Sequence, residues 1–184
     1  MPPRVLLHAL AGLKAEHELG DSNVPELLGT QKLKKGVKRY SYQGSDNNQL
    51  FKSSYDHIDG HDCRKCSAEE KVERDERDST DLEVYYGTIA SGNTLVKDVA
   101  TRDRIVEDLG EDCICFEIEA AGLMNHFPCL VIRGICDYAD SHKNNQWQRY
   151  ASATAAAYGK DLLRYIPARD LANTQKALFL LESS

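Results

Sequence analysis

Apolar side chains recur at helical spacing in two stretches of the chain, one near each end. In residues 4–19 they stand mostly three or four positions apart, directly after two prolines, which predicts one amphipathic helix. A second stripe runs through residues 146–166, and Pro167 follows it with a ring that cannot continue a helix. The sequence therefore predicts two long helices, each with one buried face.

Three short stretches between these helices have the composition of β-strands. Residues 84–91 are rich in β-branched and aromatic side chains, and residues 113–117 form a short apolar run. Residues 129–136 are almost continuously apolar, a pattern typical of a strand that is buried on both faces of a sheet. We therefore expect each of these stretches to be a strand of one sheet.

Two shorter helices are predicted between these strands. Residues 101–109 form the first, with Thr101 as its predicted N-cap and Gly110 as its end. Residues 119–125 form the second. Strands and helices that alternate in this way favour an α/β fold with a mainly parallel or mixed sheet, whose ligands bind at the carboxyl ends of the strands.

Residues 21–83 interrupt this alternation with a long polar segment. A weak helical signal covers residues 26–33, and residues 34–48 are mostly polar. Residues 68–83 contain eight acidic and three basic side chains with almost no apolar ones, a composition that does not build a core. We interpret residues 56–83 as a mobile, solvated loop.

The charge balance excludes several classes of partner. A net charge of −6 and a pI of about 5.5 leave no broad basic surface, so nucleic acid is not an expected partner. No stretch reaches the roughly 20 apolar residues that span a bilayer, and the N-terminus lacks the pattern of a secretory signal. We expect an intracellular, water-soluble domain with no membrane partner.

The six cysteines fall into two groups. Four lie in apolar, strand-like runs and are interpreted as reduced core residues: Cys113, Cys115, Cys129 and Cys136. The other two form a Cys-x-x-Cys pair with two histidines nearby, a spacing that could bind zinc: His57, His61, Cys63 and Cys66. Because this segment is highly charged and has no second Cys-x-x-Cys pair, we favour a loop without metal and keep zinc as the alternative.

Acidic side chains stand at the predicted ends of two neighbouring strands. Glu117 and Glu119 flank Ile118 where a strand turns into a helix of small residues, and a carboxylate there can accept two hydrogen bonds from the vicinal diol of a ribose. Asp137 follows the next strand, where partial desolvation would suit a general acid. One acid for a leaving base and one anchor for a ribose fit the cleavage of an N-glycosidic bond.

Three segments together resemble the purine nucleoside phosphorylase and uridine phosphorylase family, which includes the methylthioadenosine/adenosylhomocysteine nucleosidases. They are SGNTLV at residues 91–96, FEIEA at residues 116–120 and RGICDYAD at residues 133–140. The order and spacing of the three segments make the resemblance more specific than any single motif. It covers residues 85–166 well and the helix at residues 4–19 more loosely.

The resemblance implies a role for each site residue. Glu119 would hold the ribose hydroxyls, and Asp137 would be the acid that faces the base. Ile118 stands where the family often has Met. The remaining implied substrate-binding residues are Phe116, Glu117 and Ile118, with Leu95 and Val96 lining the base pocket. Glu117 and Arg133 would contact sugar or phosphate, or form a salt bridge with each other.

The resemblance also implies an architecture and a function. We expect an incomplete three-layer αβα fold, because no βαβ half with a Gly-rich phosphate-binding loop precedes these segments. The expected parts are residues 1–20 as a helix, 21–83 as a variable insert, 84–166 as the motif-bearing core, and 167–184 as a tail or helix. The version resembled is the one fused to NTPase or ankyrin regions.

The implied function is cleavage of purine nucleosides, in a chain that lacks half of the site and could self-associate through exposed strand surface. The ligand would be a nucleoside, with phosphate as a co-substrate and no other cofactor. The alternative is a catalytically inactive module that senses nucleosides or nucleotides.

Overall fold

The computed structural model describes residues 2–31, 37–60, 62–75, 79–110, 112–143 and 145–172. Within them the helices and strands are α1 (Arg4–Glu18), α2 (Val24–Gln31), β1 (Thr88–Ser91), α3 (Val99–Leu109), β2 (Cys113–Glu117), α4 (Ala120–Met124), α5 (Gln148–Leu163) and α6 (Ala168–Ala172). Short 3-10 helices lie between α2 and β1: η1 (Val37–Tyr40), η2 (Ser45–Asn47), η3 (Cys63–Lys65) and η4 (Ala68–Glu70). The predicted α/β class is confirmed.

The strands β1 and β2 pair in parallel, and α3 connects them. The register aligns Thr88 with Cys113 and Ser91 with Glu117, so both strands end at the same edge. Gly87 enters this sheet in close contact with the chain before β2, since a Cβ there would lie 2.6 Å from the carbonyl oxygen of Asp112. The sheet therefore brings Ser91, the first residue of the SGNTLV segment, beside Glu117 of the FEIEA segment.

The helix α3 begins earlier than predicted, and its N-cap is Asp98 rather than Thr101. The Asp98 carboxylate accepts a hydrogen bond of 2.7 Å from the Thr101 N–H, so Thr101 lies inside the first turn. Both Asp98 and Thr101 have a side-chain oxygen that could cap the helix. The extended backbone at Asp98 shows that the helix begins after Asp98. The predicted end at Gly110 is confirmed by its φ of 91°, which favours glycine.

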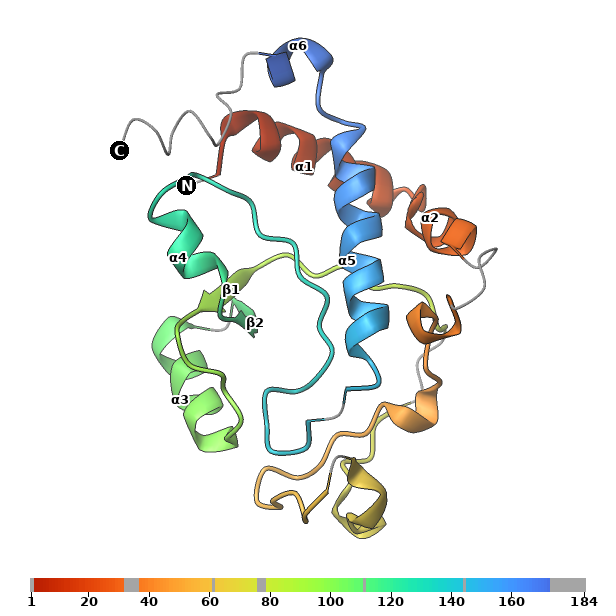
Figure 1. The fold of residues 1–184 in the computed structure, drawn as a ribbon, viewed down its shortest axis with the longest axis vertical. Coiled ribbons are helices and arrows are strands. Elements are labelled where there is room, and N and C mark those ends of the chain that lie inside the picture. The colour runs from red at the N-terminus through yellow and green to blue at the C-terminus, as the bar shows by residue number, and fades with distance from the viewer. Residues whose placement is uncertain are drawn as a thin grey trace.

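The two long predicted helices are confirmed and form the main apolar core. In Figure 1, α1 crosses the upper end of α5, and α2 lies beside it. The buried side chains of this core are Ala9, Leu13, Val24, Ala157, Tyr158 and Leu162. Two further aromatic residues of the predicted stripe, Trp147 and Tyr150, are half-buried and pack edge-on against Tyr42.

The prediction of a strand at residues 129–136 is wrong for this structure. The segment pairs with neither β1 nor β2, and in Figure 1 it runs as an irregular trace between the small sheet and α5. A Cβ on Gly134 would lie 2.0 Å from the carbonyl oxygen of Ala151, so the segment lies directly on the α5 backbone. Its apolar side chains are explained by packing against a helix. A strand also needs a neighbouring strand to pair with, and composition does not show whether one is present.

This close approach predicts a large cost for any side chain at Gly134. We expect Gly134→Ala to lower the free energy of unfolding by about 1–3 kcal/mol, because backbone must move to admit the methyl group. Gly159→Ala is the matched control in the same contact, since its Cβ would lie an ordinary 3.7 Å from Ile132 Cδ1. Urea unfolding followed by circular dichroism tests the pair, and equal midpoints would contradict the contact.

The polar segment is more structured than the sequence predicts. Phe51 is buried and pairs in an antiparallel bridge with Lys71, while its ring stacks on His142 at 4.2 Å between centroids. Short 3-10 turns replace the expected featureless loop. One buried aromatic ring and a few main-chain hydrogen bonds stabilise a polar segment that has no apolar periodicity of its own.

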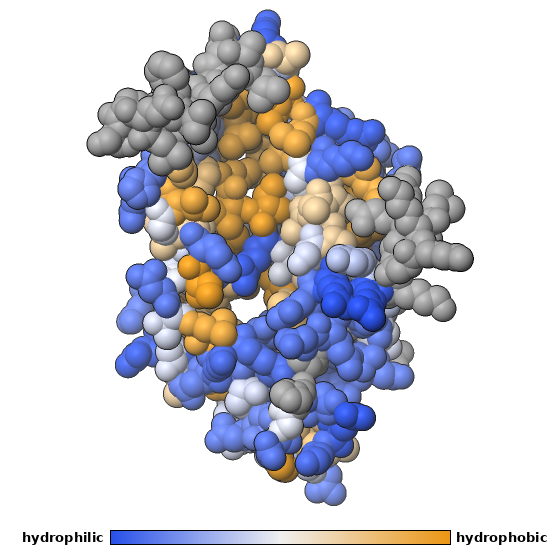
Figure 2. Space-filling view, viewed as in Figure 1, coloured by the Kyte–Doolittle hydropathy of each residue, from blue (hydrophilic) through white to orange (hydrophobic). Residues whose placement is uncertain are grey.

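The remaining expectations concern the surface and the C-terminus. Figure 2 shows apolar side chains gathered over the upper part of one face, around a central gap. Several large apolar side chains are about half-exposed, among them Ile118, Leu123, Met124 and Ile135. Of the predicted tail, α6 is described and residues 173–184 lie outside the described residues. Within the described part, no helix is both long and apolar enough to cross a bilayer.

Candidate functional site

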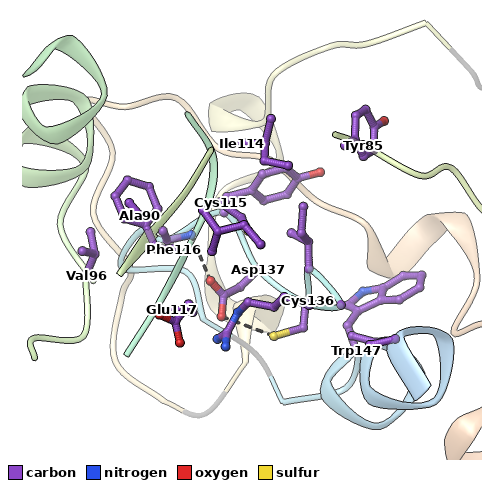
Figure 3. Close-up of a pocket in the computed structure, with 18 of the residues that line it drawn as sticks. Tyr85, Ala90, Val96, Ile114, Cys115, Phe116, Glu117, Cys136, Asp137 and Trp147 are labelled. Atoms are coloured by element: carbon purple, nitrogen blue, oxygen red, sulfur yellow. Dashed lines mark hydrogen bonds between the residues drawn. The ribbon is translucent and has the colours of Figure 1, made fainter. Parts of the chain in front are cut away.

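An open hollow of about 2360 Å³ lies between the two-stranded sheet, the segment 129–139 and α5, and we call it the central hollow. Figure 3 shows its wall, with Asp137 between β2 and Trp147, the N-cap residue of α5. Most of the predicted site residues line it: Leu95, Val96, Phe116, Glu117, Ile118 and Asp137. Small-ligand pockets measure roughly 300–1,000 Å³, so a nucleoside would occupy only one part of this space.

Glu117 lies at the carboxyl end of β2 and is buried, with 4% of its surface exposed. Its Oε2 atom accepts hydrogen bonds from the backbone N–H groups of Glu119 and Ala120, both at 2.7 Å. These bonds satisfy the first turn of α4. Its Oε1 atom is buried and has no hydrogen-bond partner among the described residues. One oxygen is therefore structural, and the other can accept a hydrogen bond from a ligand.

The surroundings of Glu117 favour the ionised carboxylate. Burial raises its pKa, but the Ser91 hydroxyl, the Ala120 and Glu119 N–H groups and the positive charge of Arg133 together bring the pKa below its ordinary value. Ser91 itself accepts a 2.7 Å hydrogen bond from the Ala121 N–H. At neutral pH the Oε1 atom is thus a charged acceptor at the edge where both strands end.

Glu119 lies differently from the sequence-based expectation. Its side chain is 67% exposed, it does not line the central hollow, and its Oε2 atom is 3.3 Å from Nη1 of Arg133. Arg133 therefore forms its ion pair with Glu119, the other of the two glutamates that the sequence offered. An exposed pair of this kind contributes only about 0–1 kcal/mol, so a competing ligand can break it at little cost.

Asp137 begins a tight turn after the 129–136 segment. Its carboxylate accepts a hydrogen bond from the Ala139 N–H at 2.9 Å and is contacted by Lys143 Nζ at 3.0 and 3.1 Å. Ala139 has a φ of 53°, a left-handed conformation that a residue with a side chain adopts at a cost. Asp140 closes the turn by accepting from the His142 N–H at 2.9 Å. These contacts fix the Asp137 carboxylate in the wall of the hollow.

Three distant residues hold the same turn, and the sequence analysis did not find them. The Tyr138 hydroxyl donates to Asn48 Oδ1 at 2.6 Å and lies 2.6 Å from Arg74 Nη1, while Arg102 Nη1 donates to the Tyr138 carbonyl at 3.1 Å. The contacts span 36 to 90 positions of sequence. No local pattern could have revealed them, because Asn, Arg and Tyr are ordinary residues for a polar surface.

The proposed base contacts lie on the chain that follows β1. Val96 is buried, and Figure 3 places it next to Ala90 and Phe116. Leu95 is 47% exposed and also lines the hollow. These side chains offer an apolar surface on the side of β1, whereas the acids lie at the strand ends and on the 137–143 turn. Apolar and acidic side chains thus line the same hollow.

A separate cluster lies in the polar segment. Ligand atoms of His57, Cys63 and Cys66 all lie within 4.8 Å of one another, and His61 lies outside the described residues. Burial, together with the neighbouring Cys66, Asp140 and Asp62, raises the pKa of the Cys63 thiol to about 11. All six cysteines are free thiols, half-buried rather than fully buried.

No family model matches the chain, and no solved structure matches it. Among curated proteins, it is 42% identical over 162 residues to a nucleotide-binding leucine-rich repeat (NLR)-like protein of Hyaloscypha variabilis, covering 88% of this chain and 16% of that protein. It is 35% identical over 87 residues to the ATP nucleosidase Cap17 of Escherichia coli, covering 45% of this chain and 17% of that protein.

A third relative is the 5′-methylthioadenosine/S-adenosylhomocysteine nucleosidase of Mycobacterium tuberculosis, 30% identical over 89 residues, which are 46% of this chain and 34% of that enzyme. The chain thus spans about a third or less of the length of each relative it matches. The two nucleosidase relatives point to a nucleoside phosphorylase/nucleosidase-like superfamily.

Proposed function

We propose that this chain carries the nucleoside-binding part of a domain that cleaves the N-glycosidic bond of purine nucleosides or nucleotides. The observation that carries the proposal is the placement of Glu117 and Asp137 in the wall of one hollow that the apolar Leu95 and Val96 also line. The similarity of the chain to an ATP nucleosidase and to a methylthioadenosine/adenosylhomocysteine nucleosidase supports cleavage of an N-glycosidic bond.

In the proposed reaction the bond from the anomeric carbon to the base nitrogen breaks, and the base leaves with the electron pair. A protonated Asp137 gives its proton to the base nitrogen, which neutralises the charge that develops there. An oxygen of phosphate, or of a water molecule that gives up a proton to solvent, forms the new bond to the anomeric carbon. The apolar Leu95 and Val96 would lie against the plane of the base.

The sugar would lie at the strand ends, beside residues 117–119. Glu117 Oε1 is a buried acceptor without a partner among the described residues, and one ribose hydroxyl would supply the hydrogen bond. Glu119 would accept the second hydroxyl after leaving Arg133, since their exposed contact is weak. A vicinal diol would then be held by two carboxylates on one turn of chain.

The test is release of free base, measured by liquid chromatography, from adenosine, inosine, uridine, 5′-methylthioadenosine and ATP. Reactions with and without inorganic phosphate separate phosphorolysis from hydrolysis. Calorimetric titration of the same ligands into the chain measures binding independently of turnover. Neither binding nor base release for any purine ligand would sink the proposal.

A second function is favoured by one specific contact. Both oxygens of Asp137 are contacted by the Lys143 ammonium, so a purine must displace this cation before Asp137 can serve the base. A module that binds nucleosides or nucleotides without cleaving them would tolerate that contact. Binding in the titration together with no base release from any ligand is the expected result for such a sensing module.

The Glu119 role gives a separate prediction about the sugar. Glu119→Gln would replace one acceptor oxygen by a donor and weaken nucleoside binding by about 1–3 kcal/mol. The control is a second ligand. A 2′,3′-dideoxynucleoside lacks the diol, so it should bind equally to the unaltered chain and to Glu119→Gln. If Glu119→Gln weakened both ligands alike, Glu119 would not be a diol acceptor.

A further inference from the structure

The cluster of His57, Cys63 and Cys66 has the chemistry of a zinc site. Thiolate sulfur and imidazole nitrogen are the ligands that zinc prefers, and ligand atoms around a tetrahedral zinc ion lie roughly 3.3–3.8 Å apart. The three ligand atoms here already lie within 4.8 Å of one another. Small side-chain rotations therefore bring them to coordination distance without any movement of the backbone elements.

The backbone around the cluster holds the ligands in place. Cys66 N–H donates to the Cys63 carbonyl at 3.1 Å across the 3-10 turn η3, and the Asp62 side chain caps this turn at the Arg64 N–H. The His57 ring contacts the Asp62 carbonyl through Nε2 at 3.1 Å. A histidine that donates from one ring nitrogen to a carbonyl leaves a lone pair on the other, which is the usual arrangement of a metal-bound histidine.

The cluster also lies directly against the turn that carries Asp137. The His57 N–H donates to Ser141 Oγ at 3.1 Å, and Cys63 Sγ contacts the His142 carbonyl at 3.8 Å. The His142 ring is buried between these residues and Phe51, and its Nε2 atom has no hydrogen-bond partner among the described residues. An ion at the cluster would take the place of the Cys63 thiol proton, and the His57 N–H would still link the cluster to Ser141.

We propose that His57, Cys63 and Cys66 bind one zinc ion, with water in the fourth position, and that this ion fixes His57, whose N–H donates to Ser141, beside the turn holding Asp137. The ion replaces the thiol protons of both cysteines, which leave to solvent on binding. None of its ligands lines the central hollow, so the ion would act on the polar segment and not directly on a nucleoside. The proposal stands independently of the proposed nucleoside chemistry.

The experiment uses the reduced chain. Inductively coupled plasma mass spectrometry should find one zinc per chain, and chelation with EDTA should lower the melting temperature. Addition of CoCl₂ to the chelated chain should give the thiolate-to-cobalt charge-transfer absorption of sulfur ligation. Cys63→Ser and Cys66→Ser should lose stoichiometric zinc, and His57→Asn should weaken it, while the matched controls Cys113→Ser and His126→Asn keep it.

The cobalt spectrum of the unaltered chain keeps the test decisive even where a variant does not fold. A reduced chain that holds no zinc, and whose absorption does not change with CoCl₂, would overturn the proposal. So would a chain that is two hydrogens lighter under native conditions through a Cys63–Cys66 disulfide and binds no metal. Equal zinc content in Cys63→Ser and Cys113→Ser would overturn it as well.

Discussion

Replacing Asp137 by Asn is expected to lower the rate of base release by about 10²–10⁴-fold while nucleoside affinity changes much less. An amide keeps the size of the carboxyl group and can still accept the hydrogen bond from the Ala139 N–H. It can also hydrogen-bond the base, but it has no acidic proton to give. The measurement is steady-state base release beside calorimetric titration of the same purine nucleoside, on the protein that carries this chain.

The neighbouring acid provides the matched control for this substitution. Asp140 belongs to the same turn and is buried, but it does not line the central hollow. Its Oδ1 atom accepts from the His142 N–H at 2.9 Å, a bond that the amide of Asp140→Asn can keep. We expect Asp140→Asn to retain turnover. Full activity of Asp137→Asn would exclude a proton-donating role for Asp137.

Replacing Asp161 by Ala is expected to lower the free energy of unfolding by about 3–5 kcal/mol, the range for breaking a buried charged network. Asp161 lies in α5 with 0% of its surface exposed. Its carboxylate accepts from the backbone and side-chain N–H groups of Asn23 at 3.3 and 3.1 Å. It also lies 3.6 Å from His17 Nε2 on α1. One carboxylate thus joins α1, the start of α2 and α5.

Removal of this carboxylate would leave two partly buried donors of Asn23 without their acceptor and take the negative charge away from His17 Nε2, which is why the expected cost exceeds that of a single hydrogen bond. Glu107→Ala on α3 is the control, since Glu107 is an exposed acid and surface substitutions usually change stability by less than about 0.5 kcal/mol. Urea unfolding by circular dichroism compares the two. Equal shifts of the midpoint would show that Asp161 is not a structural anchor.

Local signals along the sequence determined the elements whose ends are marked by nearby residues. The apolar stripe of residues 4–19 predicts α1 closely, and Gly110 ends α3 because its backbone needs a positive φ. The short apolar run before Glu117 predicts β2. The ends of these elements depend on side chains within a few positions along the chain, and for that reason they can be predicted from the sequence.

The candidate site depends on contacts between residues far apart in the sequence. The sequence indicated which residues belong to the site but not how they are arranged. The sequence favoured Glu119 as the acid that faces the sugar, while the structure buries Glu117 and leaves Glu119 at the surface with Arg133. In a continuing strand Glu117 and Glu119 would share one face, but Glu119 already has helical backbone (φ −107°, ψ −36°), so the bend after β2 decides which glutamate lies inside. The pattern Glu-x-Glu is the same in either arrangement.

Three further features show what only the tertiary structure decided. The apolar run at residues 129–136 would suit a strand, but it lies on the α5 backbone at Gly134 and pairs with neither strand. The Cys63–Cys66 spacing suggested metal ligands, yet its contact with the 141–142 turn came only from packing. Asp161 is an acidic residue in a predicted helix, and the structure buries it fully. Composition and periodicity report what a segment can bury, whereas the partner that buries it lies tens of residues away and is chosen by the packing of the whole chain.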